Sequence, residues 1–224
     1  MTPRSLSTMD GDTATIASEE SESYQSRREK TGKHSARRQQ AIDAAAAIFA
    51  RVGYHGASTR AIADALGIKV ASLYFHIGSK EDALAEICLL GMERSLGYLH
   101  EAARKATVSE QIRHFFVCQR EDLIQHAEYV TVSIRERDHL SEPAQNRIRD
   151  LTAQFRADMD RMFKGAAERG ELNPELTPRH CRFIMIGTLR GISEMHLSGM
   201  NVTTNDIMDK WVDALIRGIA IDTA

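Results

Sequence analysis

The stretch TRAIADALGIKVASLYFHIGSK (Thr59–Lys80) places a small residue, Ala63, four positions before Gly67 and ten before Leu73. Two short helices that cross steeply need small side chains where they touch, and Ala63 suits that contact. The tight link between the helices needs a residue that adopts a left-handed backbone conformation, which Gly67 does without steric cost. The spacing therefore predicts two short helices joined by a tight turn, which is a helix-turn-helix.

The segments on both sides supply the apolar surface on which these two helices would pack. Upstream, apolar residues recur at helical spacing and predict a helix over 37–52 that stops at Gly53. The short helices are expected over 58–66, with Ser58 as a good N-cap, and over 70–76. A longer helix follows from about Ser79, and its apolar face continues for more than four turns.

In a helix-turn-helix the second helix lies in the major groove of DNA. The residues expected to be exposed there are small, basic or aromatic: Lys69, Val70, Ala71, Ser72, Tyr74 and Phe75. The charge distribution agrees with a polyanionic partner. Residues 27–80 hold ten Lys and Arg against three acidic residues, although the whole chain has a net charge of −2.

Several function classes find no support in the sequence. We see no uncharged apolar run long enough to span a membrane, and the polar N-terminus does not resemble a signal peptide, so a cytoplasmic location is expected. Three separated cysteines fit a reducing compartment. There is no nucleophile elbow, phosphate-binding glycine loop or His-x-x-x-His pair. We therefore expect no enzyme, cofactor or metal site.

The domain organisation is predicted from composition and periodicity. Residues 1–35 are rich in Ser, Thr and Glu and are expected to be a disordered tail. Residues 36–82 form the helix-turn-helix domain, and residues 83–224 form a larger helical domain. The expected fold is all-α, with roughly nine helices. Later helices are expected from the caps Thr107–Glu110, Ser141–Pro143, Thr177–Pro178 and Thr203–Asp206, with a short helix over 130–137.

The segment STRAIADALGIKVASLYFHIGSKEDAL resembles the DNA-binding domain of the TetR family of transcriptional regulators. The match covers about residues 37–85 and includes Leu73-Tyr74, His76 and Ser79-Lys80-Glu81. The resemblance implies an all-helical homodimer that represses transcription by binding double-stranded operator DNA until a small-molecule effector binds.

The resemblance also implies roles for individual residues. Thr59 and Arg60 reach the DNA backbone and a base, Ser72 faces base edges, and Tyr74, His76 and Lys80 hold phosphates. Each residue has a simpler interpretation: Tyr74 packs between helices, His76 is a structural hydrogen bonder, and the cations are surface charges. The basic arm over 27–38 either follows phosphates or is a flexible tail.

The expected dimer interface combines the helix after Thr177 with the last helix. Small residues on both allow close helix packing, and apolar residues flank them: Gly187, Gly191, Trp211, Ala214, Leu215 and Gly218. Packing inside one subunit is the alternative. A dimer would place two recognition helices about one DNA turn apart.

The expected effector pocket lies between the long helices of the C-terminal domain. Its predicted lining is mostly apolar, with two polar residues: Met92, Leu96, Phe116, Gln119, Phe155, Met159, Ile186 and Arg190. A stripe of Met and Phe also fits a plain core. Polar groups on these faces are more informative because burial without a partner is costly. Arg190 and Glu194 lie four residues apart and could simply pair with each other.

Two segments, RERDHLSEPAQNRIRDL and KGAAERGELNP, are similar to a TetR subgroup that senses CoA thioesters of lipid or sterol breakdown products. That subgroup tends to carry Trp and Arg where this chain has Gly191 and Glu194. The alternative function is a ligand-independent or protein-partnered DNA-binding regulator. A large cavity in the C-terminal domain would favour an effector, and a solid core would favour the alternative.

Overall fold

The computed structural model describes residues 35–200 and 207–221. Within these ranges the predicted all-α fold is confirmed. A first helix covers 35–56, and the later elements are α2 (Thr59–Ala65), α3 (Val70–Ile77), α4 (Lys80–Ala102), α5 (Val108–Gln125), α6 (Ala127–Arg135), the 3₁₀ helix η1 (Arg137–His139), α7 (Glu142–Glu168), α8 (Pro178–Leu197) and α9 (Ile207–Ile219). The expected tail, except residue 35, and the cap Thr203–Asp206 lie outside the described residues.

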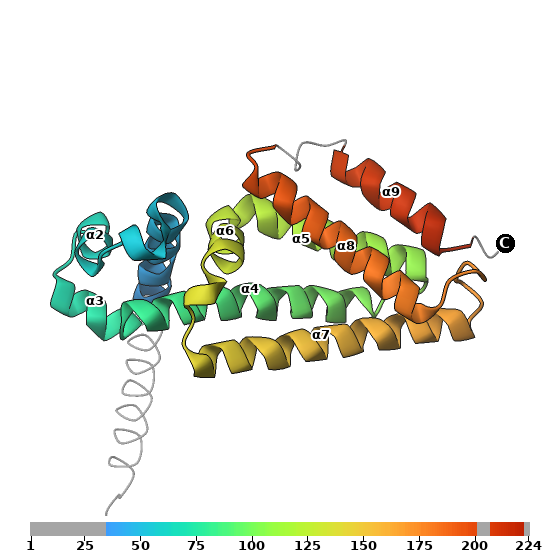
Figure 1. Cartoon of the computed structure of the whole chain (residues 1–224), viewed down its shortest axis with the longest axis horizontal. Helices are drawn as coiled ribbons and strands as arrows, with labels where there is room; N and C mark the ends of the chain where they lie inside the picture. The colour runs from blue at the N-terminus through green and yellow to red at the C-terminus, as the bar shows by residue number, and fades with distance from the viewer. Residues whose placement is uncertain (1–34, 201–206, 222–224) are drawn as a thin grey trace, which may run out of the picture.

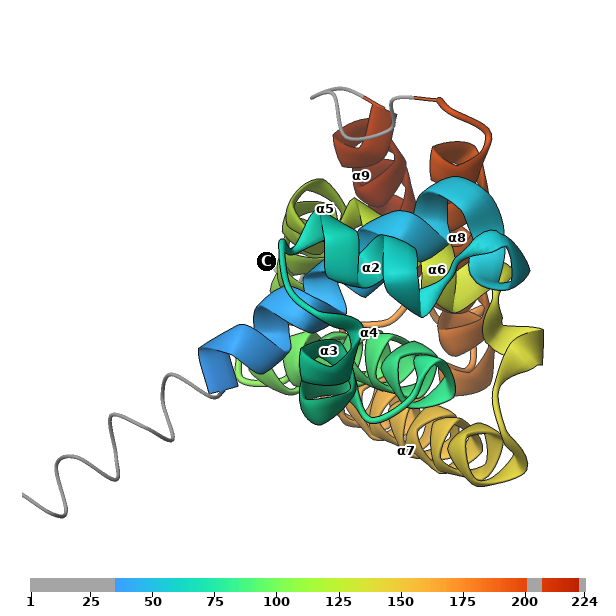
Figure 2. The same cartoon turned by 90° about the vertical axis from the view of Figure 1, so that its left-hand side faces the viewer.

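Helix α4 runs along the long axis of the molecule and connects its two ends (Figure 1). The first helix, α2 and α3 lie at one end, and α5 to α9 lie beside the rest of α4. Helix α7 runs along one side of α4, α8 crosses the molecule and packs against α7, and α9 packs against α5 and α8. Viewed from the end, α2 and α3 are in front of the other helices (Figure 2). None of the helices in the described ranges is long and apolar enough to cross a membrane.

Most predicted helix starts are confirmed because their caps form. Ser58, Ser79, Thr107 and Thr177 each accept a hydrogen bond from a backbone N–H in the first turn of the following helix. At the last three the side chain of the third helical residue also bonds back to the cap, which makes a capping box. Proline lies in the first turn of both α7 and α8, where its missing N–H costs nothing.

Two predicted boundaries were wrong. Gly53 does have a left-handed backbone, with φ of 75°, but helical structure continues beyond it to residue 56. The short helix expected over 130–137 begins earlier, at Ala127, directly after α5. It ends at Arg135, and a separate 3₁₀ turn covers Arg137–His139. Apolar periodicity alone did not indicate that His126 ends one helix and caps the next.

The buried side chains form two clusters that meet on α4. The first holds the inner faces of the three N-terminal helices together with the start of α4, and it extends onto Tyr129 and Val132 of α6 and Ile148 of α7. The second lies among α4, α5, α7, α8 and α9. Met92 packs against both clusters. Helix α4 also runs without a break through the expected domain boundary at 82/83, so that boundary stays a prediction.

Candidate nucleic-acid interface and internal cavity

The turn between α2 and α3 has the geometry that its glycine predicts. Gly67 has φ of 64°, and no atom lies within 4 Å of the place where a Cβ would be. The requirement for glycine there is therefore conformational and not a matter of space. Ala63 and Leu73 are fully buried, so the two helices approach closely and pack on the first helix.

Helix α3 presents most of its predicted recognition residues to solvent. Lys69, Ala71, Ser72, Tyr74 and Phe75 are exposed, and Val70 is half-buried. Phe75 is 72% exposed and Tyr74 47%, which is unusual for aromatic side chains of a compact protein. The exposed aromatic pair lies on the helix for which the sequence predicts DNA contact.

Thr59 at the start of α2 and Tyr74 in the middle of α3 meet at this surface. The Thr59 hydroxyl lies 3.4 Å from the Tyr74 hydroxyl, which is a long hydrogen bond. Arg60 follows Thr59 in the first turn of α2 and is exposed. Tyr74 therefore lies partly on the surface, with its hydroxyl beside α2, and its expected phosphate contact stays a prediction.

Lys80 and His76 are positioned by the protein itself. The Lys80 ammonium donates a hydrogen bond of 2.8 Å to the carbonyl oxygen of Ala57 and lies 4.2 Å from the centre of the Tyr54 ring. An ammonium group has three donors, so this contact leaves capacity for a phosphate. His76 is half-buried, and its carbonyl oxygen accepts a hydrogen bond of 2.5 Å from Arg38.

The link between α3 and α4 is closely packed. Gly78 has φ of 72°, and a Cβ there would lie 2.7 Å from the Asp82 carboxylate oxygen. That same oxygen accepts hydrogen bonds from the backbone N–H and the hydroxyl of Ser79, at 2.9 and 2.7 Å. The cap that begins α4 therefore leaves room only for glycine at the end of α3, which fixes the two helices relative to each other.

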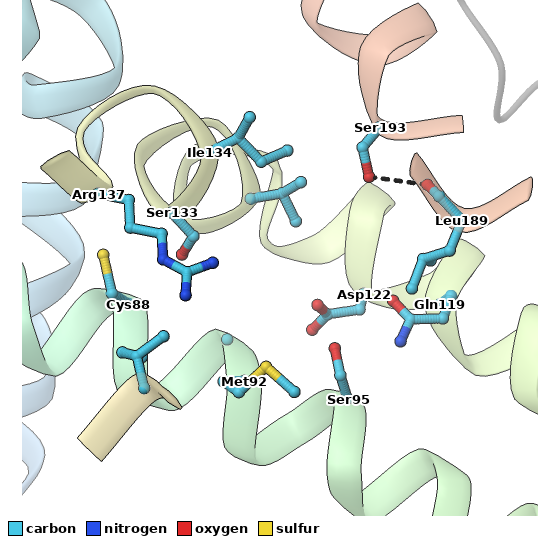
Figure 3. A pocket seen from close by; sticks show the side chains of 13 residues that line it. Cys88, Met92, Ser95, Gln119, Asp122, Ser133, Ile134, Arg137, Leu189 and Ser193 are labelled. Atoms are coloured by element: carbon cyan, nitrogen blue, oxygen red, sulfur yellow. Dashed lines mark hydrogen bonds between the residues drawn. The ribbon is translucent and has the colours of Figure 1, made fainter. Parts of the chain in front are cut away.

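Two adjoining cavities lie farther along α4, among α4, α5, α6, α7 and α8. The inner one has a volume of about 170 Å³ and reaches Cys88, Gly91, Gln119 and Asp122. The outer one has a volume of about 540 Å³ and reaches Phe155, Arg156, Ile186 and Arg190. Both share a lining that includes Met92, Ser95, Ser133, Arg137 and Leu189. Figure 3 shows Arg137, Asp122 and Gln119 pointing into one common space.

The structure distributes the predicted pocket residues between cavity and core. Met92, Gln119, Phe155, Ile186 and Arg190 line one cavity or both. Leu96, Phe116 and Met159 line neither and lie in the buried cluster of the C-terminal helices. They fill the space between helices, as the plain-core interpretation expects. The alternative for Arg190 and Glu194, an ion pair with each other, is not among the ion pairs of the described residues, and both residues line the outer cavity.

The cavity combines apolar walls with cations near its outer part. Arg137, Arg156 and Arg190 are exposed, and none of them forms an ion pair with another described residue. Deeper inside, the Gln119 side-chain amide nitrogen is buried and has no hydrogen-bond partner. A buried donor without an acceptor costs free energy, which a polar group of a bound molecule can recover.

A chain of polar contacts leads from this cavity to the first helix. Asp122, which is buried and lines the inner cavity, accepts hydrogen bonds from Arg94 at 2.7 Å and from Tyr98 at 3.0 Å. The Arg94 guanidinium lies 4.9 Å from the centre of the Tyr129 ring. Tyr129 in turn bonds to Asp43 of the first helix. Burial, together with the Asp122 carboxylate, raises the pKa of Tyr98 to about 12, so its hydroxyl remains a donor.

Sequence reasoning missed this chain of contacts, but a signal existed. Asp122 lies three residues after Gln119 and next to Leu123, so it falls on the apolar face of α5. A carboxylate on an apolar helix face needs a buried partner, and Arg94 is that partner.

Helices α8 and α9 expose an apolar surface. Phe183, Ile184, Ile207 and Trp211 are exposed, as are three of the predicted small residues, Gly187, Ala214 and Gly218. The other two predicted residues face inward. Leu215 belongs to the core, and a Cβ on Gly191 would lie 2.9 Å from the Trp211 ring, so Gly191 serves packing inside one chain.

Comparisons with known proteins agree with this arrangement. The repressor KstR2 of Rhodococcus jostii is 26% identical over 197 residues, which cover 85% of this chain and 94% of the relative. The structure of the ketosteroid regulator KstR2 of Mycobacterium tuberculosis matches with a TM-score of 0.72 at 24% identity, over 83% and 96% of the two chains. FadR of Bacillus subtilis, solved with stearoyl-CoA, matches with a TM-score of 0.65 at 22% identity, over 81% and 98%.

Family models account for both halves of the chain. The model described as "Bacterial regulatory proteins, tetR family" matches residues 41–87, which include the helix-turn-helix and the start of α4. A second model, described as "Tetracyclin repressor-like, C-terminal domain", matches residues 105–219, which include most of the cavity lining. The chain therefore belongs to the TetR family of bacterial transcriptional regulators.

Proposed function

We propose that this TetR-type regulator is a homodimeric repressor that an anionic, amphipathic small molecule releases from its operator DNA. The observation that carries the proposal is the pair of adjoining cavities, with apolar walls and three arginines at the outer part that pair with no carboxylate of residues 35–200 and 207–221. Repressors of related sequence support the direction of the effect.

DNA would be held by the exposed surface of α2 and α3. Arg60 and Lys69 supply charge for phosphates, Tyr74 supplies a hydroxyl donor, and Ser72 and Phe75 can approach base edges. Lys80 adds a charge at the N-terminus of α4, where backbone N–H groups also favour an anion. The net charge of +7 over residues 27–80 matches this role.

The second copy of the chain would cover the exposed apolar surface of α8 and α9. Helices can pack closely where Gly187, Ala214 and Gly218 lie on the surface, and Phe183 and Trp211 provide aromatic contact area. A dimer related by a twofold axis presents two α3 helices to adjacent major grooves.

The effector class follows from the lining of the cavities. The Met92, Phe155 and Ile186 side chains suit an alkyl or sterol portion, and Arg137, Arg156 and Arg190 suit carboxylate or phosphate groups. The total volume lies in the range of small-molecule sites. A CoA thioester combines both chemistries, and the structural likeness to FadR, which was solved with stearoyl-CoA, supports that class. A solid core would have favoured the ligand-independent alternative.

Release would occur through α4 and the polar contacts that leave the cavity. An effector that displaces Asp122 or Arg94 changes the support of Tyr129, which holds the first helix through Asp43. Met92 and Lys80 lie 12 residues apart on one helix, so a shift at the cavity reaches the DNA end roughly 18 Å away. The effector must prefer the state that does not bind DNA.

The test is DNA release measured with purified protein and an operator found by mapping its binding sites on host genomic DNA. Acyl-CoA thioesters, the matching free acids and CoA alone form three arms. We expect compounds with an acyl chain and an anionic head group to release the DNA. Arg156→Gln should weaken this release about tenfold. Arg149→Gln is the control, because Arg149 lies on the same helix but outside the cavities, and it should have no effect. DNA binding that none of the three arms changes would favour the ligand-independent alternative.

A further inference from the structure

Away from the cavities, three side chains with metal-ligand atoms come together between α4 and α5. Glu101 lies at the end of α4, and His114 and Cys118 lie one turn apart on α5. One potential ligand atom from each residue lies within 4.8 Å of the other two. The sequence search missed the group because it looked only for pairs of histidines, and because Glu101 comes from another helix.

We propose that Glu101, His114 and Cys118 bind a divalent transition metal ion of the zinc class, with water in the fourth position. The donors are a carboxylate oxygen, an imidazole nitrogen and a sulfur, which is a mixture that Zn²⁺ accepts. Hard cations such as Mg²⁺ and Ca²⁺ prefer oxygen ligands only, so the thiol and the imidazole select against them.

The spacing of the donor atoms suits a tetrahedral ion. His114 Nε2 lies 3.6 Å from Cys118 Sγ and 3.6 Å from Glu101 Oε2. Zinc bound at its usual distances to nitrogen, oxygen and sulfur holds its ligand atoms about 3.3–3.6 Å apart. The pairs that contain His114 are therefore already close to that spacing, and a small rotation of Glu101 completes the site.

The three side chains are accessible to an ion from solution, and two of them are held rigidly by one helix. The Glu101 side chain is 57% exposed and that of His114 28%, so an ion from solution can reach the group. His114 and Cys118 are positions i and i+4 of one helix, which places both side chains on the same face without any loop rearrangement. Their spacing is therefore fixed before an ion binds.

A bound ion would add a third polar link between two helices that the Arg94–Asp122 ion pair and the Tyr98–Asp122 hydrogen bond already join. Glu101 belongs to the last turn of α4, and the other two ligands belong to the middle of α5. Because α4 carries the DNA-contacting end of the molecule, the ion would hold the far end of that helix against α5. The metal would therefore stabilise the folded protein by an amount that grows with the logarithm of its concentration relative to its dissociation constant.

The experiment is a Co²⁺ titration of the full-length reduced protein after treatment with a chelator, followed by competition with Zn²⁺. Tetrahedral cobalt bound to a thiolate gives ligand-field bands and a sulfur-to-metal charge-transfer band. We expect one equivalent of Co²⁺ to bind with both signatures and Zn²⁺ to displace it. Zn²⁺ should also raise the melting temperature of the wild type.

Variants decide whether these three residues form the site. Cys118→Ser should lose the charge-transfer band. His114→Gln and Glu101→Gln each remove a metal ligand. Each should therefore weaken metal binding more than the loss of a residue that only supports a ligand, which costs about 10–100-fold. Two controls change residues outside the proposed site. Glu121→Gln removes an exposed carboxylate of α5, and Cys181→Ala removes a buried thiol of α8. Both variants should bind the metal as the wild type does. Circular dichroism of each variant checks that it has folded.

Two outcomes would overturn the proposal. In the first, the wild type shows no thiolate-to-cobalt band at one equivalent of metal. In the second, the band persists in Cys118→Ser or disappears in Cys181→Ala, which would place the ion at another thiol. Neither outcome depends on DNA or effector binding, so the metal site stands or falls independently of the proposed function.

Discussion

The hydroxyl of Tyr129 on α6 donates a hydrogen bond of 2.6 Å to Asp43 on the first helix, 86 residues away in the sequence. Gln39 of the same helix donates to the Tyr129 oxygen at 2.9 Å. Tyr129 is buried, and burial together with the Asp43 acceptor raises the pKa of its hydroxyl. The Tyr129 hydroxyl therefore stays protonated and remains the donor to Asp43, and this contact ties α6, beside the cavity, to the first helix.

Tyr129→Phe should test this connection. The variant loses the hydrogen bonds to Asp43 and from Gln39, which should lower the free energy of unfolding by about 1–3 kcal/mol. We also expect DNA affinity to stay close to that of the wild type and effector-induced release to weaken. Urea unfolding and effector titrations of the DNA complex measure the two effects. Tyr98→Phe removes a hydroxyl that bonds to Asp122 only, and it should affect release less. Equal effects of the two variants on release would argue against a route through the first helix.

Arg60→Ala should weaken operator binding and relax base preference, at a cost of about 1–3 kcal/mol if it makes a good base contact. The motivating observation is the exposure of Arg60 at the start of α2, beside Thr59 and Tyr74. Fluorescence anisotropy with operator and scrambled duplexes measures both effects. Arg104→Ala changes an exposed arginine in the turn after α4 and should behave as the wild type does. Unchanged isotherms for Arg60→Ala would remove it from the interface.

Lys80→Ala should weaken binding to all DNA sequences alike and reduce the slope of log affinity against log salt by about one. Because the Lys80 ammonium also bonds to the Ala57 carbonyl, a melting curve is needed to separate loss of charge from loss of packing. Lys164→Ala, an exposed cation on α7, is the control. A salt slope equal to that of the wild type would assign Lys80 a purely structural role.

Gly187→Leu should split the dimer and abolish tight operator binding. Nothing in the same chain lies within 4 Å of a Cβ at Gly187, so leucine fits the isolated subunit and would clash only with a second copy. Sedimentation velocity at micromolar concentration gives the oligomeric state. Ala167→Leu on the exposed face of α7 is the matched control. A wild-type monomer, or a dimer that survives Gly187→Leu, would contradict an interface at this surface.

Gly91→Ala should weaken the effector response several-fold while DNA binding persists. The new methyl group would enter the inner cavity and lie 3.2 Å from the Ser133 hydroxyl oxygen. Gly97→Ala lies on the same helix with nothing within 4 Å, so it should only add helix stability of up to about 1 kcal/mol. Melting temperature and effector-induced release, measured on both variants, separate cavity filling from a helix hinge at Gly91. If the two variants respond to the effector alike, Gly91 has no special role.

The sequence was most informative where local chemistry determines structure. Ser58, Gly67 and Ser79 specify the helix-turn-helix and the start of α4 because caps and left-handed turns depend on residues that are close in the chain. The two family models then confirmed the resemblance on which the expected DNA contacts rest. Those contacts, residue by residue, stay predictions.

The cavity was less predictable because it depends on which helix faces meet. Phe116 and Met159 look like pocket residues in the sequence but fill the core, whereas Ser133 and Arg137 line the cavity and lie in a segment whose helix boundaries were wrong. Glu101 and Cys118 are 17 positions apart, on two helices, so no spacing rule joins them. Charged partners such as Arg94 and Asp122 show their role only when the two helices are placed together.

The cluster that supports the helix-turn-helix also includes Tyr129, Val132, Leu140 and Ile148, which come from α6, α7 and the turn before α7. A fragment cut after α4 would therefore expose Ile87 and Cys88 to water and lose one wall of its own core. We expect such a fragment to be poorly folded, so the three N-terminal helices do not form an independently folding domain that could be moved to another protein. Chimeric regulators built from this protein should exchange the recognition surface by substitutions on α3 and keep the host chain whole.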